Sequence, residues 1–273
     1  MPDTKALRTR IKSVDSTLHL TKAMGLVASS KLRRSGEAMM KARDYAASVR
    51  GVITRLTASK ECERSAFMRR SGEDISRTRI IVIAGDRGMA GGYNANVFRL
   101  AAEYEGAQFI PIGKRACARF RADGTAEDIS SEHYSSEDAG KLARSLCSDF
   151  TAGKYDRLGI ISTKYQSMLV QTARIEWLLP LERSESVGSG VSIIFEPDEL
   201  TILGEVVPEY IAGIIAADIR ESFASEVAAR RNAMDAAGKN AGEMIEKLQL
   251  EYNRARQSAI TQEITEIVAG AQN

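Results

Sequence analysis

The first 60 residues carry one apolar repeat that never changes its register. Apolar or small side chains recur at alternating spacings of four and three residues for seven heptads. The repeat consists of Leu7, Ile11, Val14, Leu18, Thr21, Gly25, Ala28, Leu32, Ser35, Met39, Ala42, Ala46, Val49, Ile53 and Leu56. A period of 3.5 residues keeps one seam turned toward a partner helix. The pattern therefore predicts a coiled-coil helix over residues 1–60. The alternative is a helix packed on an ordinary globular core, where helices average only about 11 residues.

This seam is narrow in its middle. Between Thr21 and Ala46 only Leu32 and Met39 are large. Small seam residues allow two helix backbones to approach closely, so the predicted rod is thin. Asp3 is a candidate cap for the start of the helix.

The last part of the chain, residues 208–273, predicts a second long helix. It has no proline after Pro208, whose position suits a helix start, and its apolar residues keep a similar spacing. These residues are Met234, Ala241, Ile245, Leu248, Tyr252, Ala255 and Ala259. Gly238 and Gly242 each cost about 1 kcal/mol relative to alanine inside a helix, so a partner helix has to compensate. We expect the two ends of the chain to pair antiparallel, with the residues between them folded at one end of a rod.

Residues 77–200 have a different pattern, in which short apolar runs alternate with helical stretches. The runs are RIIVIA, AQFIPIG, DRLGIIST, MLVQTARIEWLLPL and VSIIF. Helices are predicted at 93–105 and 135–150, and the polar segment 180–190 is predicted to be a hairpin tip. Strands interleaved with helices indicate an α/β layer. The predicted fold is therefore α/β: a long antiparallel coiled coil of N- and C-terminal helices plus a central, Rossmann-like α/β domain.

The segment GDRGMAGGYN, residues 85–94, follows the first predicted strand and raises the question of nucleotide binding. A P-loop requires a Lys-Ser/Thr pair and a dinucleotide site requires GxGxxG, and the segment has neither. Asp86 would also place a negative charge beside a bound phosphate. Strand–turn–helix junctions use glycine for backbone reasons alone, so we predict a turn and no cofactor. A dinucleotide-binding enzyme is kept as an alternative that stabilisation by a dinucleotide would support.

No catalytic or metal-binding set is predicted elsewhere. Cys62, Cys117 and Cys147 are far apart and lack CxxC spacing, which disfavours a disulfide framework and a zinc site. His19 and His133 have no second ligand at a suitable spacing and are predicted to be solvated. No apolar run approaches the ~18 residues of a membrane-spanning helix, so any membrane association is expected to come through partners.

Charge is distributed unevenly between the two ends. Residues 1–60 carry 13 Lys and Arg against 4 Asp and Glu, whereas residues 208–273 carry 7 against 10. A basic helix leaves open a nucleic-acid-binding coiled coil, whose affinity would fall steeply with salt. Tyr45 is the only aromatic residue in the first 60, which argues against stacking on single strands.

Three well-separated segments together resemble one known family. They are ALRTRIKSVDSTLHLTKAMGLVASSKLRR near the start, GDRGMAGGYN in the middle and EYNRARQSAITQEITEIVAGA near the end. The first and last are similar to the terminal helices of the gamma subunit of F-type ATP synthases, and the second is similar to that family's loop SDRGLCGGFN. The segments occur in the family's order and extend over the whole chain.

The resemblance implies a rotor subunit with no catalytic residue of its own. The terminal helices would form a shaft inside a ring of alternating alpha and beta subunits. The α/β domain would be a foot on the membrane ring of c subunits, beside the epsilon subunit. Ion flow would turn the foot, and the shaft would drive the beta catalytic sites to synthesise ATP. The lack of a transit peptide and of a chloroplast-type insertion favours a bacterial protein at the cytoplasmic face of the cell membrane.

The resemblance also assigns a lower set of partner contacts. Lys22 and Met24 in TKAM, with Arg230 in RRNAM, would face an acidic loop of the beta subunit. From the residues alone, Met24 is more typical of a core position than of a contact. The family's glutamate after TKAM is Gly25 here, which is expected to weaken the shaft or alter the charge that faces beta.

An upper set of contacts lies near the C-terminus. Arg256 and Gln257 in ARQ, with Thr261 and Glu263 in ITQE, would contact a beta-subunit loop higher on the shaft. The alternative for each of them is a solvated helix face.

Overall fold

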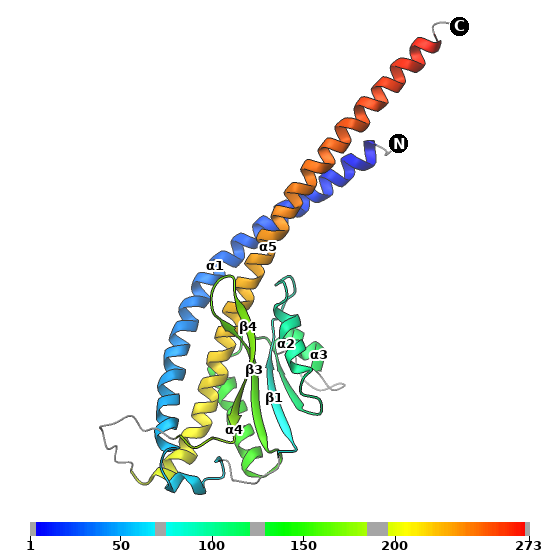
Figure 1. The fold of residues 1–273 in the computed structure, drawn as a ribbon. Helices are drawn as coiled ribbons and strands as arrows, with labels where there is room; N and C mark the ends of the chain where they lie inside the picture. The colour runs from blue at the N-terminus through cyan, green and yellow to red at the C-terminus, as the bar shows by residue number, and fades with distance from the viewer. Residues whose placement is uncertain (1–3, 69–74, 121–128, 185–195, 271–273) are drawn as a thin grey trace. The chain divides into compact units, whose positions relative to one another are not determined.

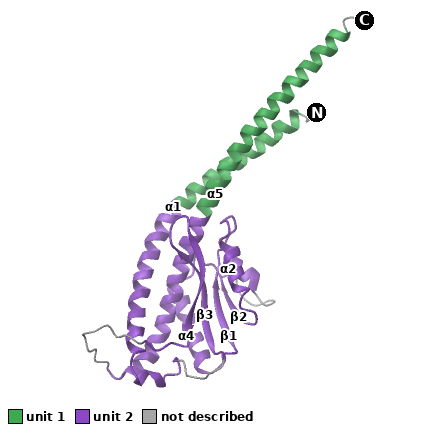
Figure 2. Ribbon diagram, viewed as in Figure 1, with its two compact units in different colours: residues 1–29, 230–273 green, residues 30–229 purple. Residues whose placement is uncertain are grey.

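The computed structural model describes residues 4–68, 75–120, 129–184 and 196–270 (Figure 1). The elements are α1 (Thr4–Leu56), η1 (Glu61–Arg64), β1 (Thr78–Ile83), α2 (Tyr93–Ala101), β2 (Gln108–Ile112), α3 (Lys114–Phe120), α4 (Ser136–Thr151), β3 (Arg157–Tyr165), β4 (Gln171–Leu179) and α5 (Glu199–Gly270). They form two compact units. Unit 1 comprises Met1–Ser29 and Arg230–Asn273, and unit 2 comprises Ser30–Ala229 (Figure 2).

Unit 1 is an antiparallel pair made from the start of α1 and the end of α5 (Figure 2). A Cβ placed on Gly238 would lie 3.5 Å from Thr21 Oγ1 and 3.9 Å from Leu18 Cδ1. One turn further along α1, a Cβ on Gly25 would lie 3.7 Å from Met234 Cβ. Residue numbers therefore rise on one helix as they fall on the other, which confirms the expected antiparallel pairing.

The predicted heptad seam is the packed face of α1. All of its members from Leu7 to Leu56 are buried or half-buried. In unit 2 the same seam packs on the first part of α5, where Gly213 leaves room for Tyr45: a Cβ on Gly213 would lie 2.7 Å from the Tyr45 ring. The expected cap, Asp3, lies outside the described residues.

The second long helix begins earlier than the sequence predicts. It starts at Glu199, and Pro208 lies inside it rather than at its start. The start is capped by Asp198, whose carboxylate accepts hydrogen bonds from the Thr201 backbone N–H at 2.8 Å and from the Thr201 hydroxyl at 2.7 Å. Proline removes one helix hydrogen bond, but the neighbouring Leu203 and Val207 are fully buried. Tertiary packing therefore outweighs the helix-breaking tendency of proline here.

Unit 2 contains a four-stranded sheet in the order β2-β1-β3-β4. β1 is parallel to β2 and β3, and β4 runs antiparallel at one edge. Alternate β1 residues point to opposite faces: Ile80 and Val82 pack with α2 and α3, while Ile81 and Ile83 pack with α1, α4 and α5. This arrangement confirms the predicted α/β layer. The predicted run VSIIF and most of the predicted hairpin tip lie outside the described residues.

The end of β3 is bound by side chains of α5. β1 stops pairing with β3 at Ile161, so the backbone of Thr163 and Tyr165 extends past it. Ser222 Oγ accepts a hydrogen bond from the Thr163 N–H at 3.0 Å, and the Glu221 carboxylate accepts one from the Tyr165 N–H at 2.9 Å. Helix side chains thus pair backbone groups that would otherwise be buried without partners.

α5 also contains an 18-residue window with a mean hydropathy of 1.6, apolar enough to span a membrane by length and composition. This departs from the expectation that the chain has no such run. Half of that window is buried within the protein. In unit 2 the apolar residues Leu203, Ile211 and Ile214 of this helix are fully buried in the core, as is typical of large aliphatic side chains.

Candidate partner-binding site

The glycine-rich segment after β1 is organised by its own carboxylate. Asp86 accepts hydrogen bonds from Ser130 Oγ at 2.6 Å and from the backbone N–H groups of Lys114, Ser131 and Glu132 at 3.0 to 3.2 Å. Burial raises the pKa of Asp86, but these hydrogen bonds outweigh it and hold the pKa below its ordinary value. The Lys114 N–H, at the start of α3, is therefore already bound by a carboxylate of the chain itself.

The glycines around this segment meet backbone requirements, as predicted. Gly91 has a φ of 56°, in the left-handed region that glycine tolerates. Gly113 has a φ of 97°, and a Cβ there would lie 1.9 Å from the carbonyl oxygen of Ala84. Asn94 fixes the segment by accepting a hydrogen bond from Gly85 N–H at 2.9 Å and donating one to Arg87 O at 3.2 Å.

Within the described residues, no group of three or more His, Cys, Asp and Glu is placed to hold a metal ion. The three cysteines are buried. Burial raises the pKa of Cys62 to about 11 and of Cys147 to about 12, so both are thiols rather than reactive thiolates at neutral pH.

The lower predicted set lies in unit 1, on both helices. Lys22 is exposed, whereas Met24 and Arg230 are half-buried. Lys22 lies one turn from the contact of Gly25 with Met234 on α1, and Arg230 lies one turn from it in the opposite direction on α5. These two residues are thus about 10 Å apart along the pair. Because Met24 is half-buried, its exposure matches neither a core position nor a fully exposed contact.

Lys22 and Met24 point to different sides of α1. Two residues apart on a helix are separated by about 200°. Met24 shares its side with Leu20 and Val27, which are four residues before and three residues after it and are 60% and 59% exposed. The structure therefore places the members of the lower set on different sides of α1, with Leu26, which is 74% exposed, on the side of Lys22, and Leu20 and Val27 on the side of Met24.

The upper predicted set lies within about the last four turns of α5. Arg256, Gln257, Thr261 and Glu263 are all exposed. Ala259 is the last α5 residue that is half-buried, and every described residue from 260 to 270 is exposed. The helix thus extends beyond its pairing within unit 1 by roughly 16 Å.

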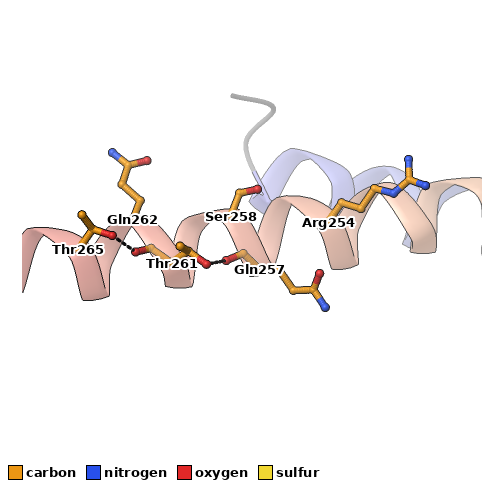
Figure 3. A pocket seen from close by; sticks show the side chains of 6 residues that line it. All are labelled: Arg254, Gln257, Ser258, Thr261, Gln262 and Thr265. Carbon is orange, nitrogen blue, oxygen red and sulfur yellow. Dashed lines mark hydrogen bonds between the residues drawn. The ribbon is translucent and has the colours of Figure 1, made fainter.

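Two members of the upper set share a shallow hollow on one side of α5 (Figure 3). The hollow is lined by Arg254, Gln257, Ser258, Thr261, Gln262 and Thr265. Gln257 and Thr261 are joined by a hydrogen bond from the Thr261 hydroxyl to the Gln257 carbonyl at 2.9 Å (Figure 3). Arg256 and Glu263 do not line it. They are two turns apart and lie on another side of the helix.

Between these two polar sides lies an apolar stripe that the sequence reasoning missed. Ile260, Ile264 and Ile267 follow a spacing of four and three, and they are 48%, 56% and 71% exposed. The spacing places them on one helix side, flanked by Arg256 and Glu263 on one edge and Gln257 on the other. The signal was present in the sequence: the apolar residues after Ala259 leave the register of the seam.

A protein-family model and several known proteins match this chain over nearly its whole length. The family model described as ATP synthase matches residues 3–273. The ATP synthase gamma chain of Geobacter sp. strain M21 is 35% identical over 286 residues, covering 100% of this chain and 99% of the relative. The gamma chain of Ruminococcus albus is 38% identical over 288 residues, covering 100% and 99%.

Solved structures share the fold. The central stalk and c-ring structure of the Tetrahymena thermophila mitochondrial ATP synthase contains a chain with a TM-score of 0.60 and 22% identity, covering 80% of this chain and 99% of that one. The rotor of the Euglena gracilis mitochondrial ATP synthase contains one with a TM-score of 0.63 and 17% identity, covering 94% and 98%.

Proposed function

This chain belongs to the ATP synthase gamma-chain family, and we propose that it is the shaft that carries rotation from a membrane ring of c subunits to catalytic beta subunits. The observation that carries the proposal is the free end of α5, where the described residues from 260 to 270 are all exposed although the helix is regular. A helical segment as short as residues 260–270, when it packs on nothing, is only marginally stable in water. A surrounding partner would cover its isoleucine stripe.

The two contact sets suit a rotating part. The lower set has Lys22 and Met24 on different sides of α1, and the upper set has polar and apolar sides. A beta subunit that faces the shaft would therefore meet a different chemistry as the shaft turns. Charged groups guide such encounters without locking them, because solvent screens their attraction.

The lower set is proposed to face an acidic loop of beta, through Lys22, Met24 and Arg230. The upper set, Arg256, Gln257, Thr261 and Glu263, is proposed to contact a beta loop nearer the far end of the shaft. We add Ile260, Ile264 and Ile267 to the upper set because an exposed apolar stripe on a helix is typical of a protein interface.

Unit 2 is proposed to be the foot, which rests on the membrane ring beside the epsilon subunit. The chain itself is proposed to be non-catalytic, with nucleotide hydrolysis and synthesis performed by its partners. Its place would be at the cytoplasmic face of a bacterial membrane, held there by the ring. The organisms of the gamma-chain relatives support the bacterial assignment.

The comparisons give no support to the nucleic-acid alternative. The basic residues of α1 are compatible with either a beta loop or a phosphate backbone, and salt separates the two. Binding to DNA or RNA would weaken by orders of magnitude with added salt. Assembly into a subunit ring, which also buries apolar surface, would weaken far less.

Reconstitution tests the proposal. Alpha and beta subunits of a gamma-chain relative are purified, and ATP turnover is measured with and without this chain. We expect no turnover by the chain alone and a rise when it is added to the ring. Lys22→Glu should lower that rise, while Lys41→Glu, which changes an exposed α1 residue in unit 2, should leave it unchanged. An unaltered rate on adding the wild-type chain would refute the proposal.

A further inference from the structure

Four ionisable side chains meet in unit 2 between the sheet and the long helices, and their burial differs: the side chains of Asp218 and Glu176 are 4% and 15% exposed, whereas those of Arg174 and Arg50 are 33% and 41% exposed. Asp218 comes from α5, Arg174 and Glu176 from β4, and Arg50 from α1. Arg50 Nη2 lies 2.5 Å from Glu176 Oε1. A single nitrogen of Arg174, Nη2, lies 3.5 Å from both Glu176 Oε2 and Asp218 Oδ1. Two carboxylates thus share one guanidinium at long distance.

Asp218 is poorly satisfied as a carboxylate. It is 3% exposed, and its Oδ2 has no hydrogen-bond partner among the described residues. Glu176 Oε2 and Arg174 Nε are also buried and lack such a partner in that part of the chain. Most buried polar atoms in folded proteins are hydrogen-bonded. Asp218 is therefore the carboxylate of this cluster that combines near-complete burial with an oxygen that has no hydrogen-bond partner among the described residues.

A neighbouring pair on the same helix face shows what a satisfied carboxylate looks like. Glu221, one turn along α5, is bound by Arg43 Nη2 at 2.7 Å and by the Tyr165 N–H at 2.9 Å. Arg43 also donates to the Tyr165 carbonyl at 2.6 Å. This pair has short distances and several donors, so both charges are compensated. Asp218 differs from Glu221 because its one arginine contact, with Arg174, is 3.5 Å long.

We propose that Asp218 is a proton-binding site whose ionisation destabilises the packing of α5 in unit 2. A proton on Asp218 Oδ2 would turn an orphaned acceptor into a donor within a cluster that contains an orphaned Glu176 oxygen. The proposal concerns a regulatory device in unit 2 and does not depend on the proposed rotor function.

The surrounding charges support this assignment. From the sheet, Arg174 and a hydrogen bond from Ser162 favour the ionised form of Asp218, while Glu176 opposes it. From α5 itself, Glu221 also opposes ionisation of Asp218. Tyr210, on the same helix, interacts electrostatically with both Asp218 and Arg50. Burial is the largest influence, and together these groups raise the pKa of Asp218 from 3.8 to about 6.

The direction of the pH effect follows from this shift. The folded chain holds the proton more tightly than the unfolded chain, so the stabilising contribution is fully present below pH 3.8 and is lost as pH rises to about 6. Above that pH Asp218 is ionised in the folded chain, and burying its charge lowers the free energy of unfolding by the full amount. Asp218 alone should raise the unfolding equilibrium constant roughly tenfold between about pH 5 and about pH 8.

The test compares the full-length chain with Asp218→Asn, which keeps the shape but removes the charge. Urea unfolding is followed at several pH values between about 5 and 8. We expect Asp218→Asn to unfold at higher urea than the wild type across this range, with a ratio of the two unfolding constants that is roughly tenfold larger at the alkaline end than at the acid end, because the two curves converge only toward pH 3.8 and below. Asp235→Asn, an exposed carboxylate of the same helix, should shift neither end.

A second measurement does not require a variant that folds well. Carboxyl NMR titration of the aspartates in the wild-type chain should contain one resonance with a midpoint near pH 6, the value given above for Asp218. Assignment through Asp218→Asn or through its neighbours identifies it. An Asp218 midpoint near 4, together with lower stability of Asp218→Asn at every pH, would overturn the proposal and point to a bound water that satisfies an ionised cluster.

Discussion

Gly25 of α1 faces Met234 of α5 across the seam of unit 1, and a Cβ on Gly25 would lie 3.7 Å from Met234 Cβ and 3.5 Å from Asp235 Oδ1. Both distances are ordinary contacts. The seam therefore has room for a methyl group at this position.

Gly25→Ala should stabilise unit 1. Alanine loses less backbone freedom on folding and favours a helix by about 1 kcal/mol relative to glycine. Thermal unfolding followed by circular dichroism is the measurement. Gly242→Ala is the matched control, because no heavy atom lies within 4 Å of a Cβ there and only the propensity gain applies. A loss of stability at Gly25 with a gain at Gly242 would show that the seam is closed to a methyl group.

Gly113→Ala should destabilise the chain severely, by about 3 kcal/mol or more. The residue combines a left-handed φ with a backbone oxygen 1.9 Å from the Cβ position, so neither strain nor clash can relax easily. Gly106→Ala separates the two causes. Its φ is 84°, but nothing lies within 4 Å of the Cβ, so it should cost only about 1 to 2 kcal/mol. Equal losses in urea unfolding would contradict this assignment.

Asp86→Asn should destabilise unit 2 by about 2 kcal/mol at neutral pH, because charge-assisted hydrogen bonds to a carboxylate are lost. The pKa of Asp86 is lowered in the folded chain. Its contribution is therefore present above pH 3.8, the ordinary value, and is lost as pH falls below it. Urea unfolding of both proteins at pH 7 and in acid checks the convergence. Asp44→Asn, on an exposed side of α1, should have almost no effect.

Much of the fold could be predicted because it depends on local periodicity. The seam of α1 is set by spacing alone, and its members are buried as expected. The start of α5 was missed because Pro208 is a strong local signal, whereas the actual start depends on Asp198 and on core packing around Leu203. Packing of that kind joins residues far apart in the chain and leaves no periodic trace.

For the candidate sites too, local motifs could be read from the sequence, whereas contacts between distant residues could not. Motif resemblance assigned Lys22 and Thr261 to partner contacts, which stays a prediction, but it could not indicate that Lys22 and Met24 face different sides. The role of Asp86 was hidden because its partners lie 28 to 46 residues away. The cluster around Asp218 was invisible for the same reason, since its arginines come from α1 and β4.

Ile264→Ser should leave the isolated chain unchanged in stability, within about 0.5 kcal/mol, because the residue is exposed on a helix end. In the reconstituted complex it should weaken assembly, because apolar area is lost from the proposed upper contact. The measurement is the chain concentration that gives half-maximal ATP turnover. Glu266→Ser, on another side of the same helix end, should leave that concentration unaltered. Identical behaviour of the two variants would remove the stripe from the site.

Rotation itself is the most direct measurement of the account. Glu103, exposed in unit 2, is changed to cysteine and labelled with a visible probe, while the three native cysteines are buried and should react poorly. The labelled chain is assembled with alpha and beta subunits fixed to a surface through beta. The account predicts that the probe turns in one direction when ATP is added and stops when it is removed. ATP turnover that depends on the chain while the probe stays fixed would contradict it.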